Sequence, residues 1–264
     1  MNVTLTAEQV LSFHLNGFLS IPTPITTDDE LSRMRDAYDR IFADKAGRES
    51  GDQFDLGGAD EDGKEAALPQ ILNPAKYAPE LAAGLFLDNA TAIVRQLLGP
   101  SVSAGVGHAI FKPAGVGAET PWHQDEAYWD PAWQNQNVSI WMPLQEATLE
   151  NGCLWFMPGS HEWPVLEHRS IGGDVRVHGL EMCDLSVLKD PVACPLPAGG
   201  ITIHRNRTAH YAGPNKSGTP RRALILGAGL PGKPYPGPAR SFPWNDIKET
   251  PRDARAKASQ EAKS

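Results

Sequence analysis

Short apolar runs between residues 102 and 229 decide the fold class of this chain. They are VSAGVGHAIFKP at 102–113, NVSIWMPLQEA at 137–147, GCLWFMPGSH at 152–161, GGITIHRNRTAHYAGPN at 199–215 and RRALILGAG at 221–229. Gly, Pro and Asn separate the runs, which is typical of strands joined by turns. We therefore expect a mainly β architecture, either a sandwich or a barrel, because no longer sequence repeat indicates a propeller or a solenoid.

The sequence before residue 100 has the pattern of helices. Thr6 with Gln9 and Thr27 with Glu30 each form a capping box ahead of apolar residues at helical spacing. Residues 79–98 carry a third apolar stripe of helical period before Gly99 and Pro100 stop it. Since the apolar faces of such helices need a partner, we expect them to pack on one sheet.

Two segments lack an apolar period. Residues 49–65, ESGDQFDLGGADEDGKE, are acidic and rich in Gly, so they are predicted to form a loop. That loop is either a solvated surface excursion or, within 49–68, a lid over a pocket. Residues 247–264 carry mostly polar and charged side chains and are predicted to be a frayed polar tail. We therefore expect a single domain over residues 1–246.

Composition limits the classes of partner. The chain has 264 residues with 24 Lys and Arg against 32 Asp and Glu, a formal net charge of -8. This balance predicts no nucleic-acid partner and no anionic membrane surface. We also expect no apolar run of about 18 residues, and therefore no membrane span. The three cysteines have no CxxC spacing, and the N-terminal sequence does not resemble a signal peptide, so a reduced, cytoplasmic location is predicted.

A pair of candidate metal ligands lies in the sequence His123-Gln124-Asp125. Residues at i and i+2 project from one face of an extended segment, so the imidazole and the carboxylate could bind one metal. A second histidine would complete a two-histidine, one-carboxylate facial triad, which leaves open positions on Fe(II). His204 and His210 are both candidates for that third ligand. His204 ends the alternating strand ITIH, where the favoured interpretation is a half-buried structural histidine with satisfied hydrogen bonds.

Two neighbouring arginines follow the second of these histidines. Arg221 and Arg222 start the run RRALILGAG, eleven residues after His210. Because strand side chains alternate, one arginine would face the predicted pocket and the other would face away. The planar guanidinium binds a carboxylate through two parallel bonds, which makes the inward arginine a candidate for holding a carboxylate co-substrate.

The motifs together resemble a known family. The stretches FKPAGVGAETPWHQD, SIWMPLQEATLENGCLWFMPGSH and TAHYAGPNKSGTPRRA, with LTAEQVLSFHLNGFLSIP near the start, resemble the phytanoyl-CoA dioxygenase family over roughly residues 5–230. The resemblance implies a double-stranded β-helix, a jelly roll of the cupin type. It also implies Fe(II), with 2-oxoglutarate and O₂ as co-substrates. The residues it implies are His123, Asp125 and His210 for iron, Arg221 for the distal carboxylate of 2-oxoglutarate, and Trp141, His108 and Gln70 for the co-substrate pocket.

The activity implied by the resemblance is oxidation of a small organic molecule. Asp125 stands where halogenases built on this scaffold have a small apolar residue, so hydroxylation is favoured over halogenation. Two other functions stay open: a jelly-roll lyase or hydrolase using Zn²⁺ or Mn²⁺, and a non-catalytic module that binds iron and 2-oxoglutarate. The sequence predicts neither the prime substrate nor the oligomeric state.

Overall fold

The computed structural model describes residues 3–115 and 118–262. The α-helices in these ranges are α1 (Ala7–Asn16), α2 (Asp28–Ala43), α3 (Leu85–Leu98), α4 (Pro243–Asp246) and α5 (Pro251–Glu261). The strands are β1 (Phe18–Ile21), β2 (Gln53–Asp55), β3 (Pro69–Leu72), β4 (Gly105–Lys112), β5 (Thr120–His123), β6 (Trp133–Pro143), β7 (Leu154–Phe156), β8 (His168–Ser170), β9 (Leu180–Met182), β10 (Val192–Cys194), β11 (Ile201–Arg205), β12 (His210–Ala212) and β13 (Arg221–Pro234). Short 3-10 turns lie at Pro74–Lys76, Pro79–Leu81, Asp125–Tyr128, Ser160–Glu162 and Ile171–Gly173.

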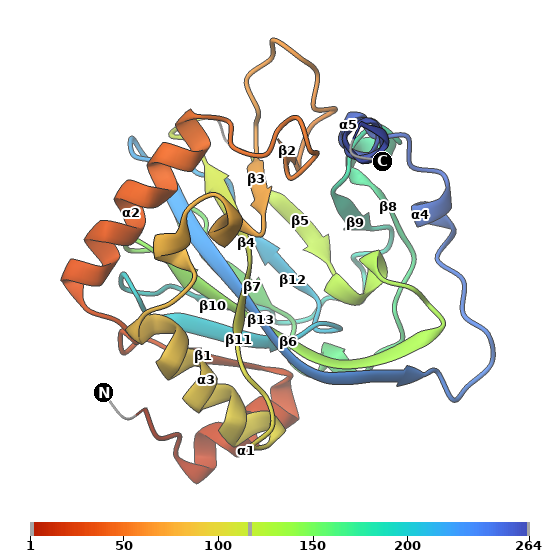
Figure 1. Cartoon of the computed structure of the whole chain (residues 1–264). Helices are drawn as coiled ribbons and strands as arrows, with labels where there is room; N and C mark the ends of the chain where they lie inside the picture. Colours follow the sequence, from red (N-terminus) through yellow and green to blue (C-terminus); the bar gives the residue numbers. More distant parts are fainter. Residues whose placement is uncertain (1–2, 116–117, 263–264) are drawn as a thin grey trace.

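The strands form two facing antiparallel sheets. The larger has the order β1-β11-β6-β13-β4-β3-β2, and the smaller has the order β10-β7-β12-β5. Strands β8 and β9 form a separate pair. Side chains from the inner faces of both sheets meet in one apolar cluster that includes Phe18, Trp141, Leu154 and Phe156. The expected mainly β, jelly-roll architecture is confirmed (Figure 1).

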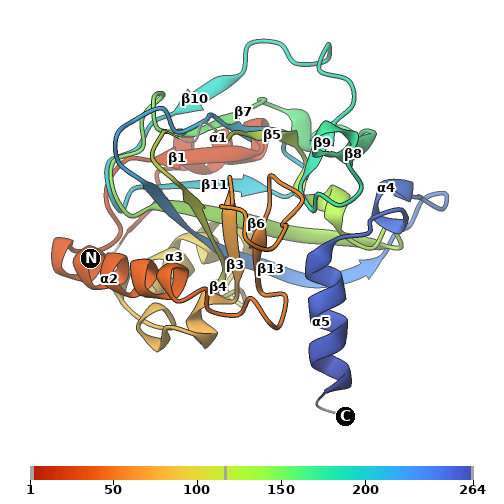
Figure 2. The ribbon, with the colours of Figure 1, turned by 90° about the horizontal axis from the view of Figure 1, so that it is seen from above.

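The helices at the N-terminal end cover the outer face of the large sheet. Both predicted N-caps are present: the hydroxyl of Thr6 accepts from the backbone N–H of Gln9, and that of Thr27 accepts from Glu30. The main core joins residues of these helices, such as Phe13 and Tyr38, to residues of the large sheet. Figures 1 and 2 show α2 and α3 on the same side of that sheet, as expected.

Residues 79–98 form the one apolar segment that could be taken for a membrane-spanning helix in the part of the chain that the structure describes. By length and composition alone, Pro79–Leu98 would be able to cross a membrane, which corrects the expectation that no such run exists. The segment is not one straight helix here, because the 3-10 turn at Pro79–Leu81 is separated from α3. The apolar stripe of α3 packs into the main core through Phe86, Ile93 and Val94. The fold therefore accounts for the hydropathy of this segment.

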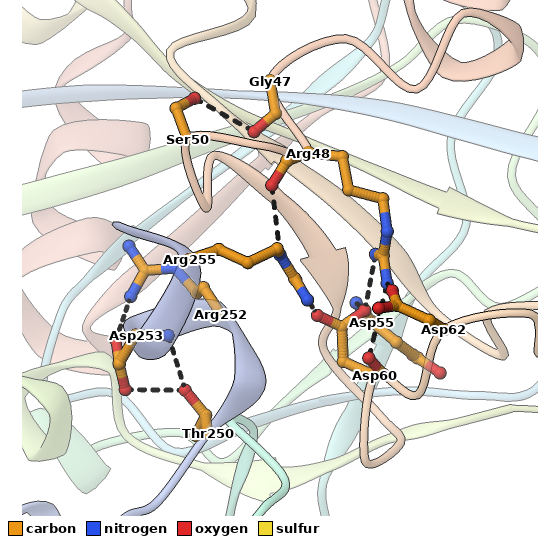
Figure 3. A network of polar contacts seen from close by, with 10 residues as sticks. All are labelled: Gly47, Arg48, Ser50, Asp55, Asp60, Asp62, Thr250, Arg252, Asp253 and Arg255. Atoms are coloured by element: carbon orange, nitrogen blue, oxygen red, sulfur yellow. Dashed lines mark hydrogen bonds and ion pairs between the residues drawn. The ribbon is translucent and has the colours of Figure 1, made fainter. Parts of the chain in front are cut away.

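The two segments without an apolar period are both ordered and touch each other. Residues 49–65 contain strand β2, and the carboxylate of Asp55 accepts three backbone N–H groups of the loop that follows. The predicted frayed tail is wrong for residues 251–261, which form α5 with Thr250 as its N-cap. Figure 3 shows the contact: Arg255 of α5 donates to the carboxylate of Asp60 and to the carbonyl of Arg48. Buried ion pairing between distant segments supplies the order that local sequence does not predict.

Candidate metal and co-substrate site

Strand pairing brings the two predicted histidines together. His123 ends β5 and His210 begins β12, and the two are directly opposed partners in the small sheet. Their ring centroids lie 4.1 Å apart. Asp125 follows at the start of the 3-10 turn Asp125–Tyr128, where the chain leaves the sheet. One donor atom from each of the three residues lies within 4.8 Å of the other two, close enough to share one metal ion.

Backbone carbonyls fix the orientation of both histidine rings. Nδ1 of His123 lies 2.8 Å from the carbonyl oxygen of Pro121, and Nδ1 of His210 lies 2.9 Å from that of Thr208. A proton on Nδ1 satisfies each carbonyl and leaves the lone pair on Nε2 free for a metal. Burial, with the neighbouring imidazoles, holds the pKa of His210 well below its usual value, so this ring is the neutral, ligating form.

The two carboxylate oxygens of Asp125 have different surroundings. Oδ1 lies 3.5 Å from Nε2 of His123 and 3.5 Å from Nε2 of His210. Oδ2 accepts from the hydroxyl of Ser139 at 2.8 Å and lies 3.4 Å from Nε2 of His204. Burial alone would raise the pKa of this carboxyl group, but electrostatic interaction with the nearby imidazoles of His210, His123 and His204 holds it well below its usual value. Asp125 is therefore ionised, with Oδ1 facing the two ligand candidates.

Arg221 is a buried cation that has no ion-pair partner within residues 3–115 and 118–262. It is 1% exposed, and its Nε and Nη1 have no hydrogen-bond partner among the described residues. Its neighbour across the β13–β4 pair, Lys112, is equally buried but donates to the carbonyls of Ala118, Ala212 and Gly213 at 3.0, 3.1 and 2.7 Å. Burial lowers the pKa of Arg221 only to about 10, so it stays charged at neutral pH. A negatively charged group would satisfy this guanidinium.

Strand alternation separates the two arginines as predicted. Arg222 points away from the inner face and forms a bidentate ion pair with Asp39 of α2 at 2.5 and 2.8 Å. Arg221 lies over the ring of Trp141, with its guanidinium carbon 5.3 Å from the ring centroid. Trp141 on β6 is the partner of Ile225 on β13. Arg221 and Ile225 are an even number of residues apart on β13, so their side chains leave the same face of the sheet.

One cavity of about 730 Å³ contains every residue predicted for the site. Its walls include His123, Asp125, His210, Arg221, Trp141, His108 and Gln70. His108 on β4 is the partner of Ile225 on β13. Burial lowers the pKa of His108 to about 4, so the His108 ring is neutral. Gln70 reaches the cavity from β3. The structure thus brings together residues from six strands and one turn.

The same cavity holds polar residues that the sequence did not single out. His178, Ser139 and Asn206 line it, and His178 lies in a stretch without ligand spacing. Ser139 could have been found, because it lies two residues before Trp141 on one strand and so shares its face. His204 also lines the cavity, and neither of its ring nitrogens has a hydrogen bond within the described ranges. The interpretation of His204 as a satisfied structural histidine is therefore wrong.

The donor set fits an iron ion. Two neutral imidazoles and one carboxylate on one side of a cavity, with the other side open, are the arrangement of non-haem Fe(II) oxygenases. The unpartnered Arg221 in the same cavity fits a second requirement, a site for a carboxylate co-substrate.

A family model agrees with this geometry. The model described as phytanoyl-CoA dioxygenase matches residues 13–223, which include every predicted site residue. The chain belongs to the phytanoyl-CoA dioxygenase family. The resemblance inferred from the sequence motifs is thereby confirmed, and the match ends before α4 and α5 begin.

Individual known proteins are similar to this chain over different spans. A probable alpha-ketoglutarate-dependent hypophosphite dioxygenase of Stutzerimonas stutzeri is 29% identical over 163 residues, covering 61% of this chain and 56% of that protein. A phytanoyl-CoA dioxygenase of Arabidopsis thaliana is 26% identical over 258 residues, covering 84% and 88%. The chain thus spans little more than half of the first relative and most of the second.

A solved structure covers nearly the whole fold. EvdO2 from Micromonospora carbonacea var. aurantiaca, complexed with 2-oxoglutarate, has a TM-score of 0.76 and 37% sequence identity, covering 92% of this chain and 98% of EvdO2. The comparisons and the His/Asp/His cluster confirm the predicted class, an Fe(II)- and 2-oxoglutarate-dependent dioxygenase, and its double-stranded β-helix fold.

Proposed function

We propose that this dioxygenase hydroxylates, or otherwise oxidises, a C–H bond of a small organic molecule. In the hydroxylation, one 2-oxoglutarate and one O₂ are consumed with each substrate R–H, and the products are R–OH, succinate and CO₂. The observation that carries the proposal is the pairing of a two-histidine, one-carboxylate cluster with a buried, unpartnered arginine in one cavity. A metal site alone would serve many reactions, whereas the added arginine accounts for a dicarboxylate co-substrate.

The residues have separate roles in this proposal. Nε2 of His123, Oδ1 of Asp125 and Nε2 of His210 would hold Fe(II) at the wall of the cavity. Arg221 binds the distal carboxylate of 2-oxoglutarate and orients the keto acid end toward the metal. Trp141 forms the wall beside Arg221.

The bound iron supplies the oxidative decarboxylation of 2-oxoglutarate and the attack on the C–H bond. The protein supplies orientation and exclusion of water. The cavity favours both, because its walls contain the apolar side chains of Leu56, Leu72, Leu154 and Ile225. His108 and Gln70 are proposed to contact the co-substrate from β4 and β3.

The proposed substrate is a small molecule rather than a macromolecule. The chain carries a net charge of -8, which supports the absence of a nucleic-acid or anionic membrane partner. The proposed location is cytoplasmic, and the three free cysteines Cys153, Cys183 and Cys194 support a reduced compartment.

The direct test is an anaerobic titration with Fe(II) and 2-oxoglutarate, followed by exposure to O₂ and a succinate assay. We expect slow succinate formation even without a prime substrate, because a co-substrate bound beside open metal positions can react with O₂ unproductively. The double variant His123→Ala/Asp125→Ala, which removes two of the three ligands, is expected to give none.

Two other outcomes would assign the site differently. Binding of Fe(II) and 2-oxoglutarate by the parent protein, with no succinate above the double variant, would favour a binding module. Turnover supported by Zn²⁺ without O₂ or 2-oxoglutarate would favour a lyase or hydrolase.

A further inference from the structure

His204 differs from the other histidines near the metal site in how its ring is held. The rings of His123, His168 and His210 each have Nδ1 within 2.9 Å of the backbone carbonyl two residues earlier. His204 has no such contact: both of its ring nitrogens are buried without a hydrogen-bond partner in the part of the chain that the structure describes. Its side chain is nevertheless only 4% exposed. A buried imidazole without partners carries a desolvation cost that needs an explanation.

The carboxylate of Asp125 lies close to His204. Nε2 of His204 lies 3.4 Å from Oδ2 of Asp125, and the ring centroids of His204 and His210 are 4.3 Å apart. His204 is not a member of the group of mutually close donors formed by His123, Asp125 and His210. It therefore approaches the site from behind the carboxylate, on the oxygen that does not face the other two ligands.

Strand register explains why His204 and Ser139 act on the same oxygen. They are directly opposed partners in the β11–β6 pair, so their side chains leave the same face of the large sheet. Ser139 already donates its hydroxyl hydrogen to Oδ2 at 2.8 Å. The large sheet thus contributes two polar side chains to the back of a carboxylate that belongs to the facing element.

We propose that His204 is a positioning residue for the metal site: its Nε2–H donates to Oδ2 of Asp125, and together with Ser139 it fixes the carboxylate so that Oδ1 faces the metal. A carboxylate free to rotate presents either oxygen or both, whereas one whose second oxygen has two donors presents a single defined ligand atom. Such partners of metal ligands raise metal affinity by about 10- to 100-fold. This assignment rests on the proposed metal site and adds a residue to it that does not touch the metal.

The test measures metal affinity rather than turnover. Co(II) is the probe, because it takes the same nitrogen and oxygen donors, is stable in air at neutral pH and gives visible absorption bands that report its coordination. We expect His204→Leu to weaken Co(II) binding by about 10-fold or more. His204→Gln, whose amide N–H can reach the same oxygen, is expected to restore binding to within about 3-fold of the parent protein.

Ser139→Ala provides an independent variant if His204→Leu does not fold. Removing this second donor to Oδ2 is expected to weaken Co(II) binding, and in the His204→Gln background the loss should stay moderate because one donor remains. His161→Leu is the matched control: His161 is also buried, with Nδ1 unpartnered, but it lies in the 3-10 turn Ser160–Glu162 beside Glu162. Its substitution is expected to leave the Co(II) dissociation constant unchanged.

The outcomes separate this proposal from the one on which it rests. If the parent protein binds Co(II) and His210→Ala does not, the metal site holds. Unchanged affinity in both His204→Leu and Ser139→Ala would then overturn the positioning role alone. Equal and complete loss in His204→Leu and His204→Gln would overturn it in favour of direct ligation by the ring. Binding by His210→Ala as tight as that of the parent would overturn both proposals.

Discussion

Two walls of the same cavity are built by different physical means. The wall with the metal ligands is a pair of sheets, in which backbone hydrogen bonds fix His210 opposite His123 and His204 opposite Ser139. The wall that carries Leu56 and His178 is built from loops, and it is held by charged side chains of segments about 200 residues apart, such as Arg255 and Asp60. In the sheets, the alternation of side chains along a strand predicts which residues face the cavity. No such sequence pattern predicts ion pairs between distant segments.

Contacts of the second wall run from α5 to the cavity. The guanidinium of Arg252 lies 4.9 Å from the ring centroid of Phe54, and that ring meets His178 edge-on at 4.9 Å. The backbone N–H of Gly179 donates to the carbonyl of Leu56 at 3.0 Å. Changes in this network are therefore expected to affect stability, while changes in the sheets affect binding of metal and co-substrate.

Removing a metal ligand from the sheets is expected to have the largest effect. His210→Ala should abolish Fe(II) binding, because only two of the three donors remain. The free energy of unfolding should change far less than the free energy of metal binding. Burial keeps the ring of His210 neutral in the parent protein, so its removal leaves no buried charge without a partner. Isothermal titration under anaerobic conditions measures the affinity. Iron binding that survived in His210→Ala but not in His204→Ala would exchange the roles of the two histidines.

Arg221→Ala is expected to have the next largest effect. Loss of a bidentate, charge-assisted contact should raise the dissociation constant of 2-oxoglutarate by about 100-fold, with metal affinity nearly unchanged. Arg222→Ala is the matched control, because Arg222 faces Asp39 outside the cavity. The assignment fails if Arg222→Ala, and not Arg221→Ala, loses affinity for 2-oxoglutarate, since that would mean a strand register shifted by one residue.

The second wall can be broken at Asp60 without touching the sheets. Its carboxylate is 4% exposed and pairs with Arg48 and Arg255. Asp60→Asn keeps the shape of the side chain and tolerates the left-handed backbone at this position, so it removes mainly the charge. We expect a loss of about 3 kcal/mol in the free energy of unfolding, measured in urea, because two partly buried cations lose a buried carboxylate partner.

Asp62 offers the control for that substitution. It also pairs with Arg48, but its side chain is 89% exposed. Asp62→Asn is therefore expected to lower the free energy of unfolding much less than Asp60→Asn does, because water screens an exposed ion pair. Equal losses in Asp60→Asn and Asp62→Asn would show that burial of this network does not determine its strength. Affinities for Fe(II) and 2-oxoglutarate should stay unchanged in both variants.

The smallest expected effect concerns pH. Burial, with the charges of Lys248 and Arg252, lowers the pKa of His178 from 6.5 to about 3. Between these values the unfolded chain binds a proton that the folded protein does not, so stability is full above pH 6.5 and falls as the pH drops toward 3. His178→Phe should reduce the slope of unfolding free energy against pH by up to one proton. An unchanged slope in His178→Phe would contradict the account.

The residues of the first wall, which carries the metal ligands, could be predicted because their directions follow the alternation of side chains along a strand. The positions of His123 and Asp125, the inward direction of Arg221 and the outward direction of Arg222 all follow from a period of two. The choice between His204 and His210 did not, because both end up beside Asp125 and only the three-dimensional positions of their nitrogens separate them. Similarity to the family made that choice where spacing could not.

The second wall escaped prediction for a different reason. Residues 251–261 look like a polar tail because α5 has no buried apolar stripe and is held instead by Arg252 and Arg255. Asp60 looks like one of several solvated acidic residues until its two arginine partners are known. Charged residues that are buried by pairing carry no periodic signal, so the sequence predicted only a loop for the first segment and a frayed polar tail for the second.

The most direct test of the central claim is an anaerobic crystal structure with Mn(II), as a redox-stable substitute for Fe(II), and 2-oxoglutarate. The account predicts one metal ion bound by Nε2 of His123, Oδ1 of Asp125 and Nε2 of His210, with the distal carboxylate of 2-oxoglutarate on the guanidinium of Arg221. A metal bound by His204 in place of His210, or a co-substrate carboxylate bound away from Arg221, would contradict it.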